Sequence, residues 1–160
     1  MRKKDQSRTL PHEMIFINER KILMPFHDSI HEVRIALTVE RFDEAVQFYR
    51  DRLGLPVVKQ WQTAEGSGVI LTLGRHTTLE LFDASQAAFV DQMEVGKRVS
   101  GPVRLALSVQ DVEAGTEMFQ QAGALVLSQP KTMPWGDCNA RVEPPDGMQI
   151  TLYQTTPVRD

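Results

Sequence analysis

A short motif that carries an arginine occurs twice in the chain. It reads VRIALTV at Val33–Val39 and VRLALSV at Val103–Val109, so Arg34 and Arg104 hold the same place in the two copies. Apolar residues at alternate positions predict a strand in each copy, with the arginine on the face opposite the valines and leucines. A guanidinium carries a planar set of N–H donors that suits a carboxylate or a phosphate. The two motifs therefore predict a site for an anionic group.

A second pair of aligned strands adds a carboxylate and a hydroxyl. The segment LELF at Leu79–Phe82 aligns with ITLY at Ile150–Tyr153. Alternation along a strand places Glu80 and Thr151 on the same side as the arginines. If the sheets curl into a trough, these polar side chains meet in one cavity. The ligand-binding residues we expect there are Arg34, Glu80, Arg104 and Thr151, with Phe82, Tyr153, Trp61 and Trp135 as its apolar walls.

Each motif opens a longer repeat that positions these side chains. In the first copy, apolar residues at spacings of three and four between Phe42 and Leu53 predict an amphipathic helix that ends at Gly54. A similar pattern ends at Gly123 in the second copy. Three strand-like runs follow each helix: LPVVKQWQT, GVILTLG and TTLELFD, and then ALVLSQP, CNARVEP and MQITLYQ. The predicted fold is α+β, with two tandem βαβββ modules whose curved mixed sheets form a cavity.

The repeat divides the chain into five segments. An N-terminal arm covers 1–30, and its apolar stretches at Met14–Ile17 and Ile22–Met24 suggest an added strand. The first module covers 31–84 and the second covers 101–156. A linker at 85–100, predicted as a helical turn followed by polar residues, joins the modules, and 157–160 form a tail.

The composition is that of an ordinary globular protein. Of the 160 residues 41% are hydrophobic and 24% are charged, and the net charge is −3. A protein that binds nucleic acid or an anionic membrane surface needs a clear excess of basic residues, so neither partner is expected. No apolar run approaches the length of a membrane helix. With one cysteine, Cys138, the chain has no internal disulfide, and we expect a cytoplasmic location.

Longer stretches of the chain resemble a known family. The strand–helix–three-strand repeat, the segments FDEAVQFYRDRLGL and TLELF, and the closing PPDGMQITLY are similar to the vicinal oxygen chelate superfamily. That superfamily includes glyoxalase I, bleomycin-resistance proteins and extradiol dioxygenases. The resemblance covers about residues 31–156 and implies a glyoxalase-like fold. It also implies that the metal positions of the family, a histidine on the first strand of each module and a carboxylate on the last, correspond to Arg34, Glu80, Arg104 and Thr151.

These four residues are a poor set of metal ligands. A guanidinium stays protonated and has no lone pair to donate, so only Glu80 is suited to coordinate a cation. A catalytic site for zinc or iron usually needs about three protein ligands. We therefore expect no metal and no cofactor, unless a relocated set that includes His76 provides one. The four histidines, His12, His27, His31 and His76, show no ligand spacing.

Several functions remain open at this stage. The first is a metal-free binding protein for a small anionic or aromatic molecule, similar to the bleomycin-resistance branch, for which the resemblance implies a role in antibiotic resistance. The second is a lyase, isomerase or dioxygenase with a relocated metal, or with Glu80 as a general base. The third is a scaffold or regulatory subunit in which Glu80 only bridges the two arginines. A homodimer is expected in each case, because the N-terminal arm suits contact with a partner subunit.

Overall fold

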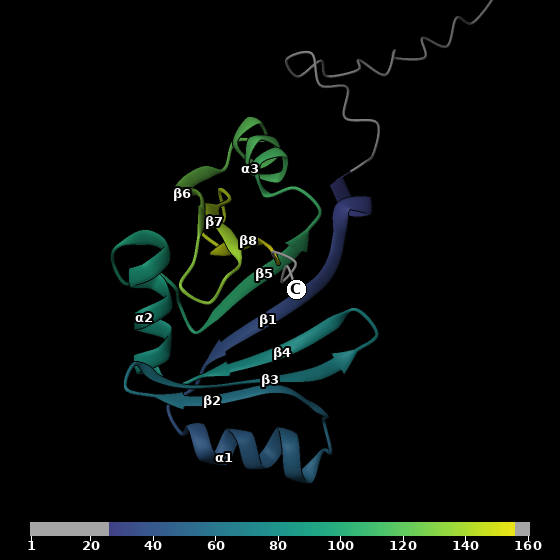
Figure 1. Cartoon of the computed structure of the whole chain (residues 1–160), viewed down its shortest axis with the longest axis vertical. Coiled ribbons are helices and arrows are strands. Elements are labelled where there is room, and N and C mark those ends of the chain that lie inside the picture. The colour runs from purple at the N-terminus through teal and green to yellow at the C-terminus, as the bar shows by residue number, and fades with distance from the viewer. Residues whose placement is uncertain (1–25, 156–160) are drawn as a thin grey trace, which may run out of the picture.

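The computed structural model describes residues 26–155, and its main feature is one curved sheet of eight strands. The strand order is β2-β3-β4-β1-β5-β8-β7-β6. Each half of this order holds the strands of one module, so the sequence repeat becomes a spatial repeat. Figure 1 shows the sheet from the side, with the first module below and the second above. The predicted α+β fold of two βαβββ modules is confirmed, with both modules in one continuous sheet.

The first module follows the predicted order of elements. A 3-10 turn η1 (Phe26–Ser29) leads into β1 (Ile30–Thr38), and a helix follows as α1 (Phe42–Val46) with a π-helical continuation η2 (Gln47–Arg52). The remaining strands are β2 (Val57–Thr63), β3 (Gly66–Gly74) and β4 (Thr77–Phe82). Strand β4 lies parallel to β1, which is the pairing that a helical crossover produces.

The second module repeats this arrangement. It consists of β5 (Val103–Val109), α3 (Val112–Gln121), β6 (Leu125–Thr132), β7 (Cys138–Glu143) and β8 (Ile150–Gln154). The side chain of Asp111 caps the start of α3 by accepting a hydrogen bond from the Ala114 N–H. Gly115 lies against Leu152, where a Cβ would already be in close contact, so the helix packs tightly on β8.

The segment expected to be a linker forms a third helix, α2 (Ala84–Val95). Asp83 caps its first turn by accepting a hydrogen bond from the Gln86 N–H, and Gly96 ends it in the left-handed conformation. The helix contacts strands of both modules. In Figure 1 it stands at the side of the sheet, between the two halves. The prediction of a helical turn was therefore too short, and the connection between the modules is an ordered element.

Two apolar cores hold α1 and α3 to the outer face of the sheet. In the first module the buried residues of the core are Val46, Val69, Leu71, Leu79 and Leu81. The second module has the matching core, with Leu107, Val109, Val112, Ala124, Ala140, Val142, Ile150 and Leu152. Because side chains alternate along a strand, the residues between these apolar positions point to the inner, concave face.

The two modules meet along an antiparallel pairing of β1 with β5. Val33 pairs with Leu107, and Ile35 pairs with Leu105. The arginine-bearing strands of the sequence repeat are therefore neighbours at the centre of the sheet.

Some expectations concern parts of the chain outside the described residues. The apolar stretches of the arm at 14–17 and 22–24 lie there, as does the tail at 157–160. No helix in residues 26–155 is long and apolar enough to cross a membrane.

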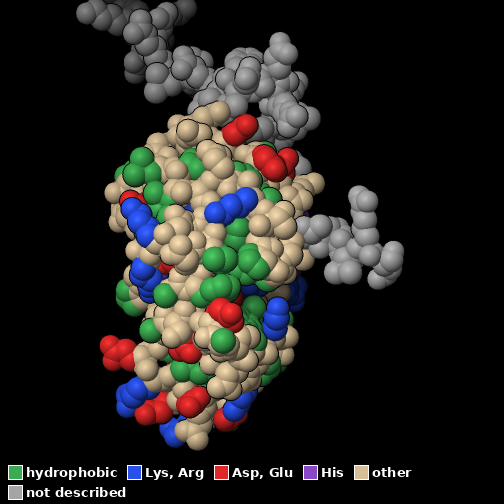
Figure 2. All heavy atoms as spheres, turned by 60° about the vertical axis from the view of Figure 1, so that its left-hand side comes forward, with side chains coloured by type: hydrophobic (Ala, Val, Ile, Leu, Met, Phe, Trp, Pro, Cys, Tyr) green, Lys and Arg blue, Asp and Glu red, His purple; other side chains and the backbone are tan. Residues whose placement is uncertain are grey.

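On the face that Figure 2 shows, acidic and basic side chains are interspersed.

Candidate ligand-binding site

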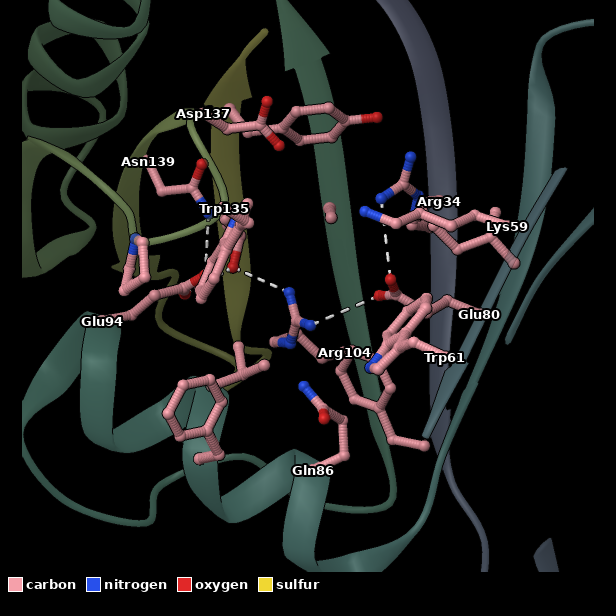
Figure 3. Close-up of a pocket in the computed structure, with 18 of the residues that line it drawn as sticks. Arg34, Lys59, Trp61, Glu80, Gln86, Glu94, Arg104, Trp135, Asp137 and Asn139 are labelled. Atoms are coloured by element: carbon pink, nitrogen blue, oxygen red, sulfur yellow. Dashed lines mark hydrogen bonds and ion pairs between the residues drawn. The ribbon is translucent and has the colours of Figure 1, made fainter. Parts of the chain in front are cut away.

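A cavity of about 600 Å³ lies on the concave face of the sheet. Its floor comes from the central strands, and its walls come from β2, helix α2 and the loop between β6 and β7. Figure 3 shows the side chains converging on it from these elements. All eight residues predicted for the site line the cavity: Arg34, Trp61, Glu80, Phe82, Arg104, Trp135, Thr151 and Tyr153.

Strand register explains why the charged groups of the floor meet. Arg34 pairs with Ala106 across the β1–β5 boundary, and Arg104 pairs with Ala36. Each long arginine thus has a methyl group as its neighbour on the adjacent strand, which leaves open space above the sheet. Ala36 also pairs with Glu80 on its other side, so the carboxylate lies in the same row as Arg104.

Glu80 lies between the two arginines. Its Oε1 is 3.6 Å from Nη1 of Arg34, and its Oε2 is 3.6 Å from Nη2 of Arg104. Both distances exceed those of a direct hydrogen bond, so these contacts are ion pairs without close donation. Within residues 26–155 the carboxylate accepts no hydrogen bond that meets normal geometry. The predicted bridge between the two arginines is therefore present, but it is loose.

Burial changes the proton affinity of Glu80. The residue is only 6% exposed, and removal from water raises the pKa of its carboxyl above the ordinary value, although Arg34 and Arg104 act in the opposite direction. A buried carboxyl with a raised pKa inside a cavity is a candidate for proton transfer or for ligand-linked protonation.

Arg34 has a second acidic partner that the sequence analysis missed. Its Nε and Nη2 donate to Oε1 of Glu32, and Nε also lies 3.2 Å from the Thr78 hydroxyl oxygen. The guanidinium carbon lies 5.0 Å from the centre of the Tyr153 ring. Burial works against ionisation of Glu32, but hydrogen bonds from Thr78 and the charge of Arg34 hold its pKa below the ordinary value. These contacts orient Arg34 so that Nη1 points toward Glu80.

Arg104 is held from the other side of the floor. Its Nη1 donates to the Thr151 hydroxyl at 2.8 Å, and the guanidinium carbon lies 5.9 Å from the centre of the Phe82 ring. The residue is 6% exposed. Thr151, which stands where the family places a carboxylate, thus serves as a hydrogen-bond partner for this arginine.

A second charged cluster lies beside the cavity and was not predicted. Arg141 on β7 is fully buried, and its guanidinium donates to Oε2 of Glu94 and to Oδ1 of Asp91. Both carboxylates come from α2. The hydroxyl and backbone N–H of Ser100 also donate to Asp91. These hydrogen bonds outweigh the effect of burial and lower the pKa of Asp91 far below the ordinary value. The cluster fixes α2 against the inner face of the second module.

The same cluster orients an amide in the cavity wall. Nδ2 of Asn139 donates to Oε1 of Glu94 at 2.9 Å. Its Oδ1 is buried and has no hydrogen-bond partner among the described residues. Buried polar atoms are nearly always paired, so this oxygen is an exception.

Aromatic rings form the remaining walls. The Trp61 indole lies over Gly68, where a Cβ would be 2.1 Å from the ring, and its centroid is 6.0 Å from that of Phe82. Lys59 lies 5.7 Å from the centre of the same indole. Trp135 comes from the loop between β6 and β7 and is 38% exposed.

Several lining residues had signals in the sequence that could have been used. Strand alternation places Glu32 with Arg34, and it places Lys59 with Trp61. Asp137, two residues after the predicted Trp135, also lines the cavity, and burial raises the pKa of its carboxyl. The α2 residues that line the cavity include Gln86, Phe89 and Glu94. They were not predicted for the site because the segment was expected to be a linker.

Comparison with known proteins agrees with this architecture. Residues 31–152 match the sequence model of the Glyoxalase/Bleomycin resistance protein/Dioxygenase superfamily. The chain belongs to this superfamily. A curated relative, a probable lactoylglutathione lyase from Synechocystis sp., is 27% identical over 127 residues, which is 78% of this chain and 95% of the relative.

Solved structures show the same fold. Methylmalonyl-CoA epimerase from Mycobacterium tuberculosis superposes with a TM-score of 0.57 at 18% identity and covers 86% of this chain and 95% of its own. A superfamily member from Vibrio splendidus 12B01 gives a TM-score of 0.54 at 17% identity, with 77% and 97% covered. At these identities the likeness concerns the fold.

The metal chemistry of the superfamily does not fit the residues at this site. The positions implied for ligands hold two guanidinium groups, one carboxylate and one hydroxyl, and both guanidinium groups repel a divalent cation. In the part of the chain that the structure describes, no group of three or more His, Cys, Asp or Glu residues is placed to hold a metal ion. The side chains at these positions therefore do not supply the donor atoms that a metal ion needs.

Proposed function

We propose that this protein binds a small organic acid in the cavity without a metal. Arg34 and Arg104 hold the anionic group of the ligand on the floor, and Trp61, Phe82 and Trp135 contact its planar, apolar part. The cavity, at about 600 Å³, has the size of a typical small-molecule site.

The observation that carries this proposal is the loose bridge at Glu80. Because each ion pair is 3.6 Å long, Nη1 of Arg34 and Nη2 of Arg104 have donor capacity that Glu80 does not use fully. A carboxylate that enters the cavity can accept from these N–H groups at normal hydrogen-bond length. Glu80 competes with such a ligand while it is ionised, and its raised pKa favours protonation when a second anion approaches.

A calorimetric titration tests the proposal. Benzoate and the two naphthoates serve as probes, since each joins one carboxylate to a planar ring. We expect Arg34→Met to weaken binding by about tenfold or more, because a hydrogen bond to a charged group is lost. Arg50→Met is the matched control, since Arg50 does not line the cavity and pairs with Asp51. Equal affinities of the wild type and Arg34→Met, or no binding by the wild type, contradict the proposal.

Glu80 also supports a second candidate function, proton transfer on a bound acid. A buried carboxylate without a hydrogen bond is suited to remove a proton from carbon next to a carbonyl group, while the arginines stabilise the negative charge that forms on oxygen. Two of the similar proteins carry enzyme names, a lyase and an epimerase. The test uses NMR to measure the exchange of the α-protons of phenylpyruvate for deuterium in D₂O. Catalysis requires that this exchange is faster with the protein than without it. Exchange that is lost in Glu80→Gln, while benzoate still binds, favours catalysis over simple binding.

A further inference from the structure

Gln86 is a buried side chain that opens on the cavity and has no partner among the described residues. It lines the cavity from the first turn of α2 and is 6% exposed. Within residues 26–155 its side-chain amide makes no hydrogen bond. The unpaired side-chain atoms that are closed to solvent in these residues include neither the nitrogen nor the oxygen of this amide, so both atoms remain accessible. Buried polar groups are nearly always paired, and the cavity is the place from which partners for this amide can come.

The backbone that carries this amide is fixed at the start of β3. The Gln86 N–H donates to Oδ1 of Asp83 at 2.7 Å, and Oδ2 of the same carboxylate accepts from the Ser67 N–H at 2.9 Å. Gly66 lies so close that a Cβ there would clash with the backbone nitrogen of Gln86. Figure 3 shows the Gln86 side chain pointing from α2 toward Arg104. The first turn of α2 is thus anchored to the sheet, and it presents the amide on the side of Arg104.

An amide group needs two kinds of partner. Its Nε2 can only donate and its Oε1 can only accept, so a complete partner has an acceptor and a donor side by side. A ligand carboxylate held by Arg104 would supply the acceptor. The amide can turn its nitrogen toward this carboxylate, because no described residue holds either of its atoms. Since Nε2 and Oε1 are bonded to the same carbon, the matching donor has to lie on the ligand atom next to the carboxylate.

The nearby charge decides what kind of donor fits. An ammonium group brings a positive charge and three N–H bonds into the cavity, whereas Gln86 supplies one neutral oxygen and Arg104 repels a second cation. A hydroxyl group, or the N–H of an acylated amine, carries no charge and needs only one acceptor. The site therefore favours an uncharged donor over an ammonium group.

We propose that the ligand is an acid with an uncharged donor on the carbon next to its carboxylate, either a 2-hydroxy acid or an N-acylated 2-amino acid. Nε2 of Gln86 donates to one carboxylate oxygen, and Oε1 accepts from the neighbouring O–H or N–H. This inference rests on the proposed function, since it takes the carboxylate to lie at Arg34 and Arg104. Gln86 is then a residue that determines specificity, because a site built to pair with a donor discriminates strongly against an analogue that lacks it.

Calorimetry with matched probes tests this inference. Each probe is phenylacetate with a different group next to the carboxylate: the hydroxyl of mandelate, the acetylamino group of N-acetylphenylglycine, or a methoxy group, which has no donor. In the wild type we expect the better enantiomer of mandelate or of N-acetylphenylglycine to bind about tenfold more tightly than phenylacetate and the methoxy compound. The mirror image should lose most of this advantage, because it cannot place its carboxylate, donor and ring together. Mandelate and N-acetylphenylglycine then show which of the two donors the cavity takes.

Two variants of Gln86 change its hydrogen bonds in different ways. Gln86→Leu removes both polar atoms, so the preference for a donor and for one enantiomer should fall to about twofold or less. Gln86→Glu keeps the size and an acceptor but replaces the N–H donor by a negative charge, so every probe should bind at least about tenfold more weakly. Gln92→Leu is the matched control, since Gln92 lies on the same helix, is exposed and does not line the cavity. It should leave each affinity within about twofold of the wild type.

The possible outcomes separate this inference from the proposed function. A wild type that binds phenylacetate as tightly as every enantiomer of the donor-bearing probes leaves the proposed function intact and overturns the inference, whether or not the variants fold. A donor preference that persists in Gln86→Leu overturns it too, as does an unchanged affinity of Gln86→Glu for phenylacetate. Binding of the benzoates without any of these probes also overturns the inference alone. A wild type that binds neither set overturns the proposed function, and the inference with it.

Discussion

The two modules share one fold and use their charged residues differently. In the first module Glu80 pairs across the strands with the apolar Ile70, and its carboxylate faces the cavity. The equivalent pair in the second module is Thr151 with Arg141, and this arginine is bound by two carboxylates of α2. The first module therefore leaves its carboxylate open to the cavity, whereas the second uses the charge of Arg141 to hold a helix. The repeated sequence determines which face of the sheet a side chain points to, and the neighbouring residues determine whether that side chain is paired.

The largest expected effect comes from breaking the charged cluster of the second module. Arg141→Met leaves Glu94 buried without its charged partner and removes one of the two guanidinium partners of Asp91, and we expect a loss of about 3–5 kcal/mol in the free energy of unfolding. Urea denaturation followed by circular dichroism measures it. Arg98→Met is the control, because Arg98 also pairs with Asp91 but is 39% exposed, and about 1 kcal/mol or less should be lost. Similar losses in the two variants would contradict a structural role specific to Arg141.

A smaller effect is expected from the position in the first module that corresponds to Asn139. Gly68 pairs with Phe82 as Asn139 pairs with Tyr153, and the space above Gly68 is filled by Trp61. In Gly68→Ala the new methyl group displaces the indole, so benzoate or naphthoate binding should weaken by about fivefold to tenfold. Gly101→Ala is the control, since nothing lies within 4 Å of the position of its Cβ. Unchanged affinity in Gly68→Ala would show that Trp61 is not part of the binding wall.

The smallest effect concerns pH and the carboxylate of the first module. The pKa of Glu80 is raised in the folded protein, so its ionisation costs stability above the ordinary value of 4.5, and the full cost is present above the folded pKa. Glu80→Gln should therefore be slightly more stable than the wild type at neutral pH, and the difference should vanish as the pH falls below about 4.5. Urea denaturation at several pH values measures this, with the exposed Glu44→Gln as control. A Glu80→Gln protein that is less stable than the wild type at neutral pH would show that the ion pairs of Glu80 with Arg34 and Arg104 stabilise the fold more than burial of the charge destabilises it.

The same protonation affects binding. An ionised Glu80 competes with an anionic ligand for Arg34 and Arg104, and a protonated Glu80 does not. Benzoate affinity should therefore rise as the pH falls through the pKa of Glu80, as long as the ligand itself stays ionised. In Glu80→Gln this dependence should be absent, and calorimetry in buffers of different ionisation enthalpy should detect no proton uptake.

Much of the site followed from the sequence because strands impose a simple rule. Alternation along β1, β4, β5 and β8 correctly placed Arg34, Glu80, Arg104 and Thr151 on one face, and the repeat brought the strands together. This inference needs only local geometry and the pairing of equivalent strands.

The contribution of α2 could not be predicted in the same way. Its buried face includes Gln86, Asp91 and Glu94, so apolar periodicity does not mark it as a packed helix. Asp91 and Glu94 can be buried because Arg141, Ser100 and Asn139 pair with them from distant parts of the chain. The capping residue Asp83 and the terminal Gly96 were local signals of a full helix, and they indicate its length without indicating what it covers.

The pairing of β1 with β5 also determines how the protein can adapt to new molecules. Arg34 and Arg104 stand on adjacent strands whose separation is set by backbone hydrogen bonds, so the spacing of their Cα atoms cannot change unless the sheet opens. The backbone of the floor is therefore constant, whereas the walls include Trp61 on an edge strand and Trp135 on a loop. If the proposed acid binds here, the body of the ligand can change over evolutionary time while its acidic head group stays the same.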